Sequence, residues 1–426
     1  MKSLLRLLPV VLLAVLLAAV GGVGSARAQG AAGTVVGPGE SIQKAVNAAH
    51  PGDTIIVRGV HREDVIIRKD GIKLLGQNAV IEAPPKSKAD SRCSRFYGQP
   101  EGICVLGEVD LKAEKLTGSR VSDVGISGFT IRGFNPSIDL IGTRDATVTK
   151  NRAVDSGFIG AAFSVGTKML SNVMRGPGAP GIGVDKSRNV TVAGNDVEGS
   201  SQSALFMEKD TNVTIEGNDF TDNASGMFVI DSTGTRIVSN DMSRSDQVGI
   251  LVYGPKGANG AKVVANHVSG AEFGIQVANS RGGSFSANDL HNNCAGAVFV
   301  TFGGGPRVGD YEVKGNKVTD NTKACPAERG QAAFSGIGIG LFGASNMDVT
   351  SNHLSGNVPS GPTAVSGGVV VTVDPLYSGT TKPTNNSIVA NHFGRNKPDI
   401  FYDGSGSGNR FRANDCDTSV PARLCN

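Results

Sequence analysis

Short segments of alternating hydrophobic and polar residues recur along most of this chain. Such alternation is typical of strands with one buried face, and the recurring segments lack the spacing of an amphipathic helix. Most of them end in the pattern V-x-(V/I)-x-(G)-N-x-hydrophobic, as in VTVAGNDV at 190–197, VTIEGNDF at 213–220 and YEVKGNKV at 311–318. The pattern returns about every 22 residues, which predicts a solenoid built from one repeated unit.

The asparagine of this pattern occupies the same place in each unit. These residues are Asn151, Asn172, Asn195, Asn218, Asn240, Asn266, Asn288, Asn316, Asn352, Asn391 and Asn414. Stacked coils pair their strands in parallel about 4.8 Å apart, so each asparagine should lie beside its equivalent in the next coil. Its amide can donate and accept along the stack and tolerates a left-handed backbone, so we expect a structural ladder. Gly128 should fill the same slot in the coil before Asn151.

A second strand precedes each asparagine, and counting back from the asparagine predicts its register. The residues expected to face the interior are Ile182, Val184, Leu205, Met207, Met227, Val229, Ile275 and Val277. Those expected to face outward are Gly183, Asp185, Phe206, Glu208, Phe228, Ile230, Leu251, Tyr253, Gln276, Ala278, Gly340 and Phe342. The outward set is rich in aromatic residues, although these make up only 5% of the chain.

The composition agrees with many thin coils rather than a few large globular cores. Glycine accounts for 59 of 426 residues, and tryptophan is absent. That glycine content is about twice the ordinary share. The composition and the repeat together indicate one all-β solenoid rather than several globular domains.

The charge is balanced once an N-terminal segment is set aside. The chain has 41 Lys and Arg and 38 Asp and Glu, and three of the basic residues lie in 1–28. That segment also has an apolar run and ends in Ala26-Arg27-Ala28, the form of a signal peptide. We therefore expect a secreted or extracytoplasmic protein with a neutral mature chain. The neutral charge argues against nucleic acid as a partner, and no later stretch is long enough for a membrane span.

The six cysteines of an exported chain are expected to form disulfides. They lie in three neighbouring pairs, and we prefer the pairings Cys93–Cys104, Cys294–Cys325 and Cys416–Cys425. Six cysteines allow 15 connectivities, so this is a preference based on proximity in the chain. Cys294 and Cys325 follow successive ladder asparagines, which makes their bridge geometrically plausible.

With these features, residues 35–415 resemble the right-handed parallel β-helix proteins of the pectate-lyase-like superfamily, in the branch with short parallel β-helix repeats. The most specific part is the entry segment at 36–76. In that segment Ile42, Ala45, Val46 and Ala49 fall on one face of a short helix. The resemblance implies that this helix caps the open N-terminal end of the coils.

The resemblance and the cysteines together suggest a domain organisation. We expect a signal peptide at 1–28 and one right-handed parallel β-helix domain at 29–426. Within it we expect the cap and first coils at 34–83, a disulfide-clipped loop region at 84–120, repeat coils at 121–415 and a C-terminal tail at 416–426. Residues 359–366 and 375–386 are expected to be inserted loops.

The resemblance also implies a polysaccharide groove along one parallel sheet. The residues that we expect to bind the glycan are Phe206, Glu208, Phe228, Tyr253, Gln276 and Phe342. Aromatic faces can stack on sugar rings, and contiguous apolar surface is typical of a binding site. Two alternatives remain: a long loop could cover this face, or a one-residue shift of register could turn the rings inward.

For catalysis the strongest candidates are Arg244, Asp246 and His291, on loops beside the outward residues. A lyase or epimerase of uronic acids needs a base for the C5 proton and a group that neutralises the carboxylate. A hydrolase would need two carboxylates, for which Glu208 and Asp231 are the nearest pair. The known catalytic motifs of the superfamily are absent, so an ordinary solvated role for these charges is the competing interpretation.

The residue after each ladder asparagine should form a second outward column. Its members are Asp196, Asp219, Asp241, His267, Asp289, Lys317, His353, His392 and Asp415. Stacked carboxylates repel one another, and Ca²⁺ is the cofactor that could relieve this repulsion. We assign no metal ligand from the sequence, although His353 and His392 could meet at a metal.

Three functions are compatible with the sequence. The first is an exported polysaccharide lyase or epimerase acting on uronate-containing glycan. The second is a non-catalytic β-helix that binds a glycan or a cell surface, and the third is a metal-handling accessory protein. We expect the partner to be a polysaccharide or a cell-surface glycan, and the protein to be a monomer.

Overall fold

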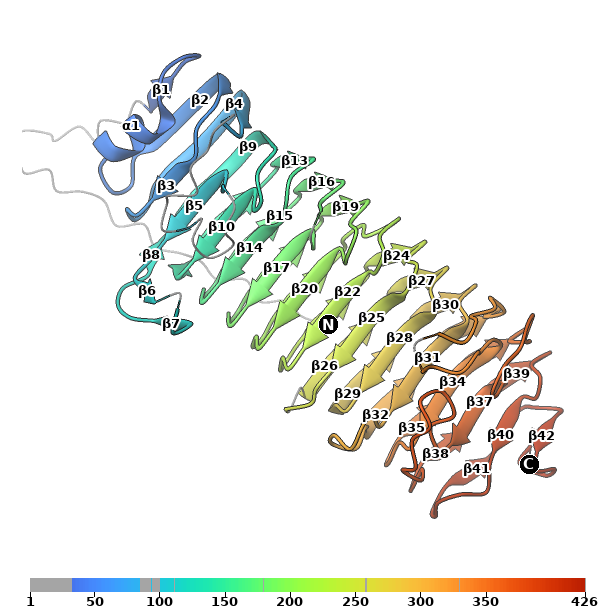
Figure 1. The fold of residues 1–426 in the computed structure, drawn as a ribbon. Coiled ribbons are helices and arrows are strands. Elements are labelled where there is room, and N and C mark those ends of the chain that lie inside the picture. The colour runs from blue at the N-terminus through green and yellow to red at the C-terminus, as the bar shows by residue number, and fades with distance from the viewer. Residues whose placement is uncertain are drawn as a thin grey trace, which may run out of the picture. The chain divides into compact units, whose positions relative to one another are not determined.

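The computed structural model describes residues 33–84, 93, 100–110, 112–178, 180–256, 259–328 and 330–425. The predicted signal peptide lies outside these residues, as does most of the segment between Pro84 and Pro100. From Gly33 onward the chain forms one compact unit. Successive coils of this unit lie side by side from the blue N-terminal strands to the red C-terminal strands (Figure 1).

Three parallel sheets run along the stack, and we name them sheets 1, 2 and 3. Sheet 1 contains β1 (Thr34–Val36), β2 (Thr54–His61), β4 (Lys73–Glu82), β9 (Gly125–Arg132), β12 (Thr147–Thr149), β13 (Arg152–Val154), β15 (Lys168–Leu170), β16 (Val173–Arg175), β18 (Thr191–Ala193), β19 (Asp196–Glu198), β21 (Thr214–Glu216), β23 (Arg236–Val238), β26 (Asn259–Val264), β29 (Arg281–Ser286), β32 (Gly309–Lys314), β35 (Asp348–Thr350), β38 (Ser387–Val389) and β41 (Arg410–Arg412).

Sheet 2 is the surface on which the aromatic residues were expected. It contains β3 (Val65–Ile67), β5 (Ile103–Leu106), β10 (Ile138–Ile141), β14 (Ile159–Ala162), β17 (Ile182–Asp185), β20 (Leu205–Glu208), β22 (Met227–Ile230), β25 (Val248–Tyr253), β28 (Phe273–Ala278), β31 (Ala295–Val300), β34 (Ile337–Phe342), β37 (Gly367–Thr372), β40 (Ile400–Tyr402) and β42 (Ser419–Val420).

Sheet 3 precedes sheet 2 in each of the later coils. It contains β24 (Asp241–Ser243), β27 (His267–Ser269), β30 (Asp289–His291), β33 (Lys317–Thr319), β36 (His353–Ser355) and β39 (His392–Gly394). Two short pairs complete the strands: β8 (Val121–Ser122) with β11 (Thr143–Arg144), and the antiparallel β6 (Val109–Asp110) with β7 (Lys115–Leu116). The all-β parallel solenoid is therefore confirmed.

The core is one continuous apolar column inside the coils. The predicted interior residues Ile182, Val184, Leu205 and Met207 are all buried in it. Their equivalents in later coils, among them Met227 and Val277, are buried in the same way. The interior register predicted from the asparagines is therefore confirmed.

The asparagine ladder is also confirmed. Asn218 Nδ2 donates to Asn240 Oδ1 at 2.8 Å, and Asn240 Nδ2 donates to Asn266 Oδ1 at 3.0 Å. The left-handed backbone, however, belongs to the residue before each asparagine, such as Gly217 with φ of 60° or Ala265 with φ of 56°. The glycine of the G-N pattern supplies this conformation at no steric cost.

Gly128 was placed one residue out of step. Its φ is 79°, so it matches the residue before an asparagine. The next residue, Phe129, donates its backbone N–H to Asn151 Oδ1 at 3.1 Å and so occupies the ladder position.

A second ladder lies at the turn between sheets 3 and 2. Asn293 Nδ2 donates to Asn321 Oδ1, Asn321 Nδ2 to Asn357 Oδ1, and Asn357 Nδ2 to Asn396 Oδ1, at 2.8–2.9 Å. The sequence analysis missed this ladder, although each of these four residues follows a ladder asparagine at the same spacing.

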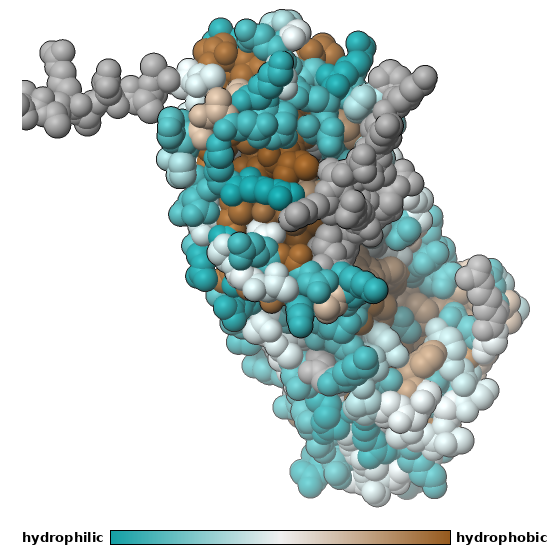
Figure 2. All heavy atoms as spheres, turned by 60° about the vertical axis from the view of Figure 1, so that its left-hand side comes forward, coloured by the Kyte–Doolittle hydropathy of each residue, from teal (hydrophilic) through white to brown (hydrophobic). Residues whose placement is uncertain are grey.

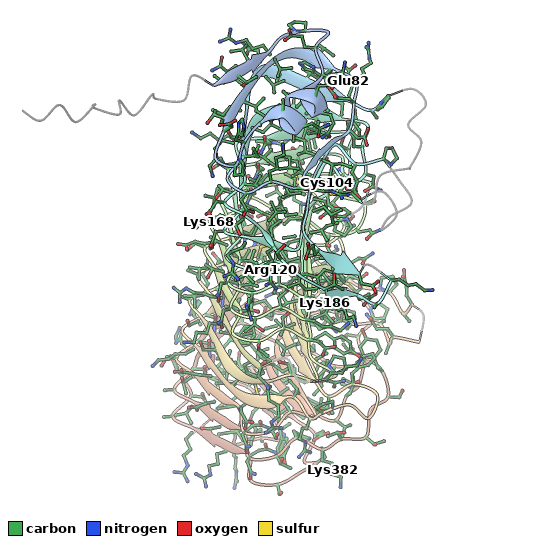
Figure 3. All side chains as sticks on the ribbon, turned by 90° about the vertical axis from the view of Figure 1, so that its left-hand side faces the viewer. Glu82, Cys104, Arg120, Lys168, Lys186 and Lys382 are labelled. Carbon is green, nitrogen blue, oxygen red and sulfur yellow. A yellow bond between two sulfur atoms is a disulfide. The ribbon has the colours of Figure 1, made fainter. Side chains whose placement is uncertain are left out.

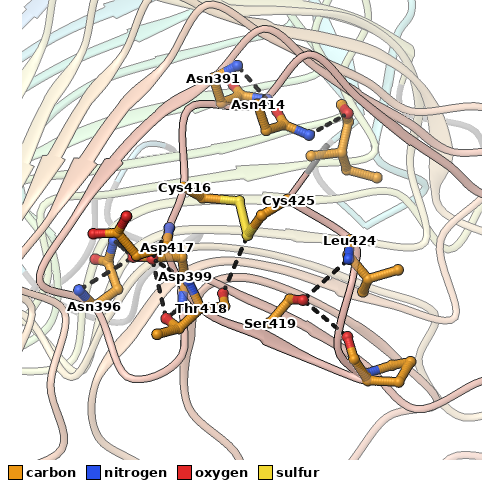
Figure 4. The surroundings of a disulfide bond; sticks show 12 residues. Asn391, Asn396, Asp399, Asn414, Cys416, Asp417, Thr418, Ser419, Leu424 and Cys425 are labelled. Carbon is orange, nitrogen blue, oxygen red and sulfur yellow. Dashed lines mark hydrogen bonds between the residues drawn. A yellow bond between two sulfur atoms is a disulfide. The ribbon is translucent and has the colours of Figure 1, made fainter.

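The two ends of the described stack are closed differently. At the N-terminal end, helix α1 (Ile42–Ala48) buries Ile42 and Val46 and is capped by Ser41, whose side chain accepts from the Lys44 N–H. At the C-terminal end, the disulfide Cys416–Cys425 ties the last turn beneath the end of the asparagine ladder (Figure 4). The other two preferred disulfides, Cys93–Cys104 and Cys294–Cys325, are present as well.

Candidate functional site

The outer face of sheet 2 carries two rows of side chains, in the predicted register. One row runs Gly183, Phe206, Phe228, Leu251, Gln276 and on to Gly340. The other runs Asp185, Glu208, Ile230, Tyr253, Ala278 and on to Phe342. Because parallel strands pair without a shift here, each residue lies directly beside its equivalent in the next coil.

The middle of this face exposes an apolar strip that we call the aromatic row: Phe206, Phe228, Leu251 and Tyr253. All four side chains are half-buried. The rings of Phe206 and Phe228 meet edge to face, with centroids 6.3 Å apart. Phe228, Leu251 and Tyr253 also pack against the neighbouring apolar cluster, so the strip shows part of each side chain to solvent.

The C-terminal half of the same face is covered, which corrects one prediction. Phe342 is fully buried, in a second apolar cluster with Phe334, Cys325 and Leu376 from the long loops. Gln276 lies against a loop residue, since it shares a hydrogen bond with Tyr377. Phe342 points outward from the sheet as predicted, but loops cover it, so it is not available to a glycan.

The covering loops are joined to one another as well as to the sheet. Ala332 N–H donates to the Leu376 carbonyl at 2.8 Å, and Ala364 N–H donates to the Ala333 carbonyl at 2.8 Å. Burial raises the pKa of the Tyr377 hydroxyl to about 12, against the opposing effect of its hydrogen bond with Gln276. The uncovered part of the face therefore ends near β25.

At the other end of the aromatic row lies a hollow of about 380 Å³, which we call the sheet hollow. It is lined by Asn135, Phe158, Gly160, Asp185 and Phe206, among others. Burial raises the pKa of Asp185, while a hydrogen bond from Lys186 opposes that rise. The hollow thus combines two phenyl rings, an amide and a carboxyl group.

Two buried carboxyl groups lie behind this hollow. Asp139 points outward from β10 and lies beside Gly160 of the next coil. The Oδ1 atom of Asp139 is 2.9 Å from the position that a Cβ atom on Gly160 would take. Burial, then the nearby Asp139 and Asp64, raise the pKa of Glu101, and burial raises the pKa of Asp139. The carboxyl group of Glu101 has no hydrogen-bond partner among the described residues, and a hydrogen bond from the backbone of Leu140 opposes the rise of the pKa of Asp139. Groups of this kind stay protonated at higher pH than ordinary carboxyls and can act as acids.

A positively charged hollow of about 200 Å³ adjoins the same coils, and we call it the basic hollow. Arg120, Lys186, Arg188 and Lys209 line it together with Ser187 and Thr211. Burial, then the nearby Arg188 and Arg144, lower the pKa of Arg120. Arg120 and Lys186 project from this side of the coils (Figure 3). Lys186 pairs with Asp185 at 3.0 Å, so the two hollows meet at this pair.

The structure places the predicted catalytic residues Arg244 and Asp246 on one turn and His291 on another coil. Arg244 is exposed and paired with Asp222, its Nε donating to Oδ1 at 2.6 Å, and Asp246 is exposed on the following turn. His291 lies two coils further on, because Ser243 pairs with Ser269 and Ser269 with His291. Two steps of about 4.8 Å place Arg244 and His291 roughly 10 Å apart.

His291 instead lies against residues of the column that follows the ladder asparagines. That column has the predicted register, from Asp241 through His267, Asp289, Lys317 and His353 to His392. The Nε2 atoms of His291 and His267 are 3.3 Å apart. Further along, the rings of His353 and His392 stack with centroids 5.1 Å apart.

The sequence matches the family described as "Right handed beta helix region" over residues 115–257, 164–318 and 255–420. These matches cover more than half of the chain. The chain belongs to this family. The right-handed β-helix that the family resemblance implied is therefore shown by the sequence match, in agreement with the parallel coils.

Solved structures of right-handed β-helix proteins resemble this chain. The A-module of the mannuronan C-5 epimerase AlgE6 from Azotobacter vinelandii has a TM-score of 0.50 at 14% identity, over 88% of this chain and 95% of that one. The catalytic unit of a GH87 α-1,3-glucanase from Streptomyces thermodiastaticus has a TM-score of 0.52 at 17% identity, over 93% and 71%. At such identities the likeness concerns the β-helix fold. A search of curated sequences found no match.

The sequence analysis of this β-helix protein did not identify the buried carboxyl groups beside the sheet hollow or the arginines of the basic hollow. Asp139 and Glu101 lie in and beside the first strands of sheet 2, where the repeat is too irregular to align. A signal was present for Asp139, because an acidic residue within the apolar segment IDLI is unusual. Arg120 and Arg188 lie on turns, and only the folded coils bring them together.

Among the described residues, the large hydrophobic residues that are exposed are Val35, Val60 and Val420. Seen from the side of the N-terminal coils, apolar surface gathers near that end, between polar residues (Figure 2). The helix within the described residues is too short to cross a membrane.

Proposed function

We propose that this protein is an extracytoplasmic β-helix that binds an anionic polysaccharide along the uncovered face of sheet 2. The aromatic row carries the proposal, because its four side chains stay half-exposed while the same face is covered further on. Phe206 and Phe228 lie on neighbouring coils, where their rings can pack against the apolar faces of sugars. The sheet hollow at the end of the row would hold one sugar more deeply.

The basic hollow supports an anionic rather than a neutral ligand. Arg120 and Arg188 lie near each other without a carboxylate partner among their described contacts. Guanidinium groups bind carboxylates through paired hydrogen bonds, and a uronate supplies one carboxylate per sugar. The neutral mature chain has no general attraction for polyanions, so selectivity would come from this local cluster.

The extracytoplasmic location is supported by chemistry of two kinds. The three disulfides suit an oxidising compartment, and residues 1–28 have the form of an export signal. Two proteins with this fold bear the names of enzymes for mannuronan and α-1,3-glucan, which agrees with a carbohydrate role.

Binding to a panel of soluble polysaccharides tests the proposal. We expect retardation in affinity electrophoresis by polyuronates and little by neutral glucans. The double variant Phe206→Ala/Phe228→Ala should lose this retardation, and Arg188→Ala should reduce it for polyuronates only. Val60→Ala, an exposed apolar residue on sheet 1, serves as the control. Equal binding by the double variant and the control would refute the proposed face.

Catalysis is a second candidate function, and the buried carboxyl pair favours it. A carboxyl group that stays protonated near neutral pH can donate a proton to a leaving oxygen. We therefore propose an elimination at the sheet hollow in which Asp139, beside Gly160, donates its proton to the leaving oxygen and the carboxylate of Asp185 takes the C5 proton. Glu101 lies beside Asp139, and Arg244, Asp246 and His291 remain the sequence-based alternative. Absorbance of unsaturated ends would report a lyase, and NMR of the product would report an epimerase.

The two catalytic alternatives give different results in that assay. If the sheet hollow is the active site, Asp139→Asn should abolish product formation and His291→Ala should leave it unchanged. The reverse result would favour the predicted loop residues. Glu216→Gln, an exposed change on sheet 1, is the control for both. If the wild-type protein forms no product from any polyuronate, binding without catalysis is the remaining function.

A further inference from the structure

Three potential metal ligands converge on the outer face of sheet 3. His267 opens β27 and Asp289 opens β30, and the two residues pair directly in the parallel register. His291 follows Asp289 by two residues, so alternation along the strand places it on the same face. One ligand atom from each of these residues lies within 4.8 Å of the other two.

The two imidazoles are spaced as ligands of one ion would be. The Nε2 atoms of His267 and His291 are 3.3 Å apart, and their ring centroids are 4.8 Å apart. Zinc–nitrogen bonds of about 2.0 Å at a tetrahedral angle place two nitrogens about 3.3 Å apart. The contact between these nitrogens therefore has the span that a shared ion requires.

Asp289 provides a carboxylate beside the two rings. Its Oδ1 is buried and has no hydrogen-bond partner among the described residues. Its Oδ2 lies 4.0 Å from His267 Nδ1 and 3.1 Å from Nζ of Lys317 on the next coil. The ammonium group of Lys317 therefore already pairs with Oδ2, the oxygen that also lies nearest to His267.

We propose that His267, Asp289 and His291 bind one divalent transition-metal ion of the Zn²⁺ class, which joins two successive coils. Two imidazoles and a carboxylate suit such ions, whereas Ca²⁺ prefers a shell of oxygen ligands. The side chains of His267 and Asp289 are 40% and 35% exposed, so an ion can enter from solvent. Three protein ligands leave the fourth tetrahedral position to water.

The site is distinct from the aromatic row and does not depend on glycan binding. It lies on sheet 3, whereas the aromatic row and both hollows lie on sheet 2 and its turns. It takes His267 and Asp289 from the column considered for Ca²⁺ and adds His291, so two of its three ligands are imidazoles, which suit Zn²⁺ rather than Ca²⁺. Lys317 competes with the ion for the carboxylate of Asp289, so removing the lysine side chain should not weaken metal binding.

Calorimetric titration of the chelator-treated protein with Zn²⁺ tests the proposal. We expect one Zn²⁺ per chain, no comparable binding of Ca²⁺, and a higher melting temperature in the presence of Zn²⁺. Loss of an outer-shell partner typically weakens metal binding about 10- to 100-fold, so His291→Gln and Asp289→Asn should weaken it by at least that much. Lys317→Ala should bind Zn²⁺ as tightly as the wild type or more tightly.

The control is His392→Gln, which alters the other histidine pair on the same sheet. It should leave the affinity unchanged, and circular dichroism should show that all variants remain folded. The proposal is overturned if the wild-type protein binds no Zn²⁺, if His291→Gln binds it normally, or if His392→Gln abolishes binding.

Discussion

Each ladder asparagine satisfies backbone groups of the coils on either side. Asn266, for example, donates to the Ile237 carbonyl and to Asn288 Oδ1, and accepts from the backbone N–H of Asn240. A hydrophobic residue of similar size would leave these buried groups without partners. The ladder is therefore a structural requirement of the turn and not a ligand-binding feature.

Asn266→Ala should strongly destabilise the protein. The change leaves buried donors and acceptors unpaired, at roughly 1–3 kcal/mol for each. We expect the free energy of unfolding, measured by urea denaturation, to fall by about 3 kcal/mol. Asn47→Ala, on the exposed side of α1, is the control and should change it little. A loss as small as that of the control would contradict the structural role.

Asp210 is an acidic residue in a column of serines. Ser187 N–H donates to its Oδ1 at 2.7 Å, and its own N–H donates to Ser232 Oγ at 3.0 Å. Burial, opposed by the hydrogen bond from Ser187, raises the pKa of Asp210 to about 8. Because the unfolded chain would release this proton near pH 4, the contribution of Asp210 to stability falls between about pH 4 and pH 8.

Asp210→Asn should remove that part of the pH dependence. As the pH rises from 5 to 8, the free energy of unfolding of the variant should increase by at least about 1 kcal/mol relative to that of the wild type. Denaturation curves at both pH values measure the gain. Asp219→Asn, an exposed change in a neighbouring coil, should show no such gain. Parallel pH profiles for Asp210→Asn and wild type would show that Asp210 is charged in the folded protein.

Among the elements, the loops after β33 and β37 decide how much of sheet 2 is accessible. The disulfide Cys294–Cys325 fastens the first of these loops, and the ring of Phe334 stacks on Phe273 with centroids 4.7 Å apart. The loops thereby convert an outward apolar face into interior. They divide sheet 2 into a covered part and the aromatic row.

Cys294→Ser/Cys325→Ser should loosen this cover. A disulfide closing a loop of this kind contributes about 2–4 kcal/mol, and its loss should expose Phe334 and Phe342. We expect increased binding of a hydrophobic fluorescent dye and faster proteolysis within residues 320–336. Cys416→Ser/Cys425→Ser, which frees only the tail, should leave dye binding unchanged. Equal dye binding by both variants would mean that packing alone holds the loops.

The sequence was sufficient for the strands and insufficient for the loops. Period-two alternation and the asparagines fix which side chains of β17 to β34 point inward, and every one of these assignments was confirmed. The burial of Phe342 depends on contacts with Phe334 and Leu376, which are distant in the chain and lie in segments without periodicity. For the same reason, the sequence did not predict that Arg120 and Arg188 line the same hollow.

At the scale of the whole solenoid, the open end is the weak point. Within the described part of the chain, strand β1 pairs with β2 on one side only, and α1 covers the adjoining core with Ile42 and Val46. An uncovered edge strand is a template for pairing with another molecule. The cap therefore protects against association as well as completing the core.

Ile42→Asp should separate α1 from the first coil. A buried unpaired charge typically costs about 3 kcal/mol or more, so the helix should detach before the coils unfold. Size-exclusion chromatography with light scattering should then show oligomers or aggregates where the wild type elutes as a smaller species. Lys44→Asp, an exposed change on the same helix, is the matched control. An Ile42→Asp protein that elutes as the wild type does would show that the cap is dispensable.

The loops that cover part of sheet 2 also limit the length of the face that a polysaccharide could occupy. From β17 to β25 the uncovered face spans three coil steps of about 4.8 Å, which is roughly 14 Å. A polymer lying along the stack would meet the loops beyond that point and leave the surface. The affinity for oligosaccharides should then rise with each added sugar until the oligosaccharide fills the uncovered face. Longer oligosaccharides should bind no more tightly.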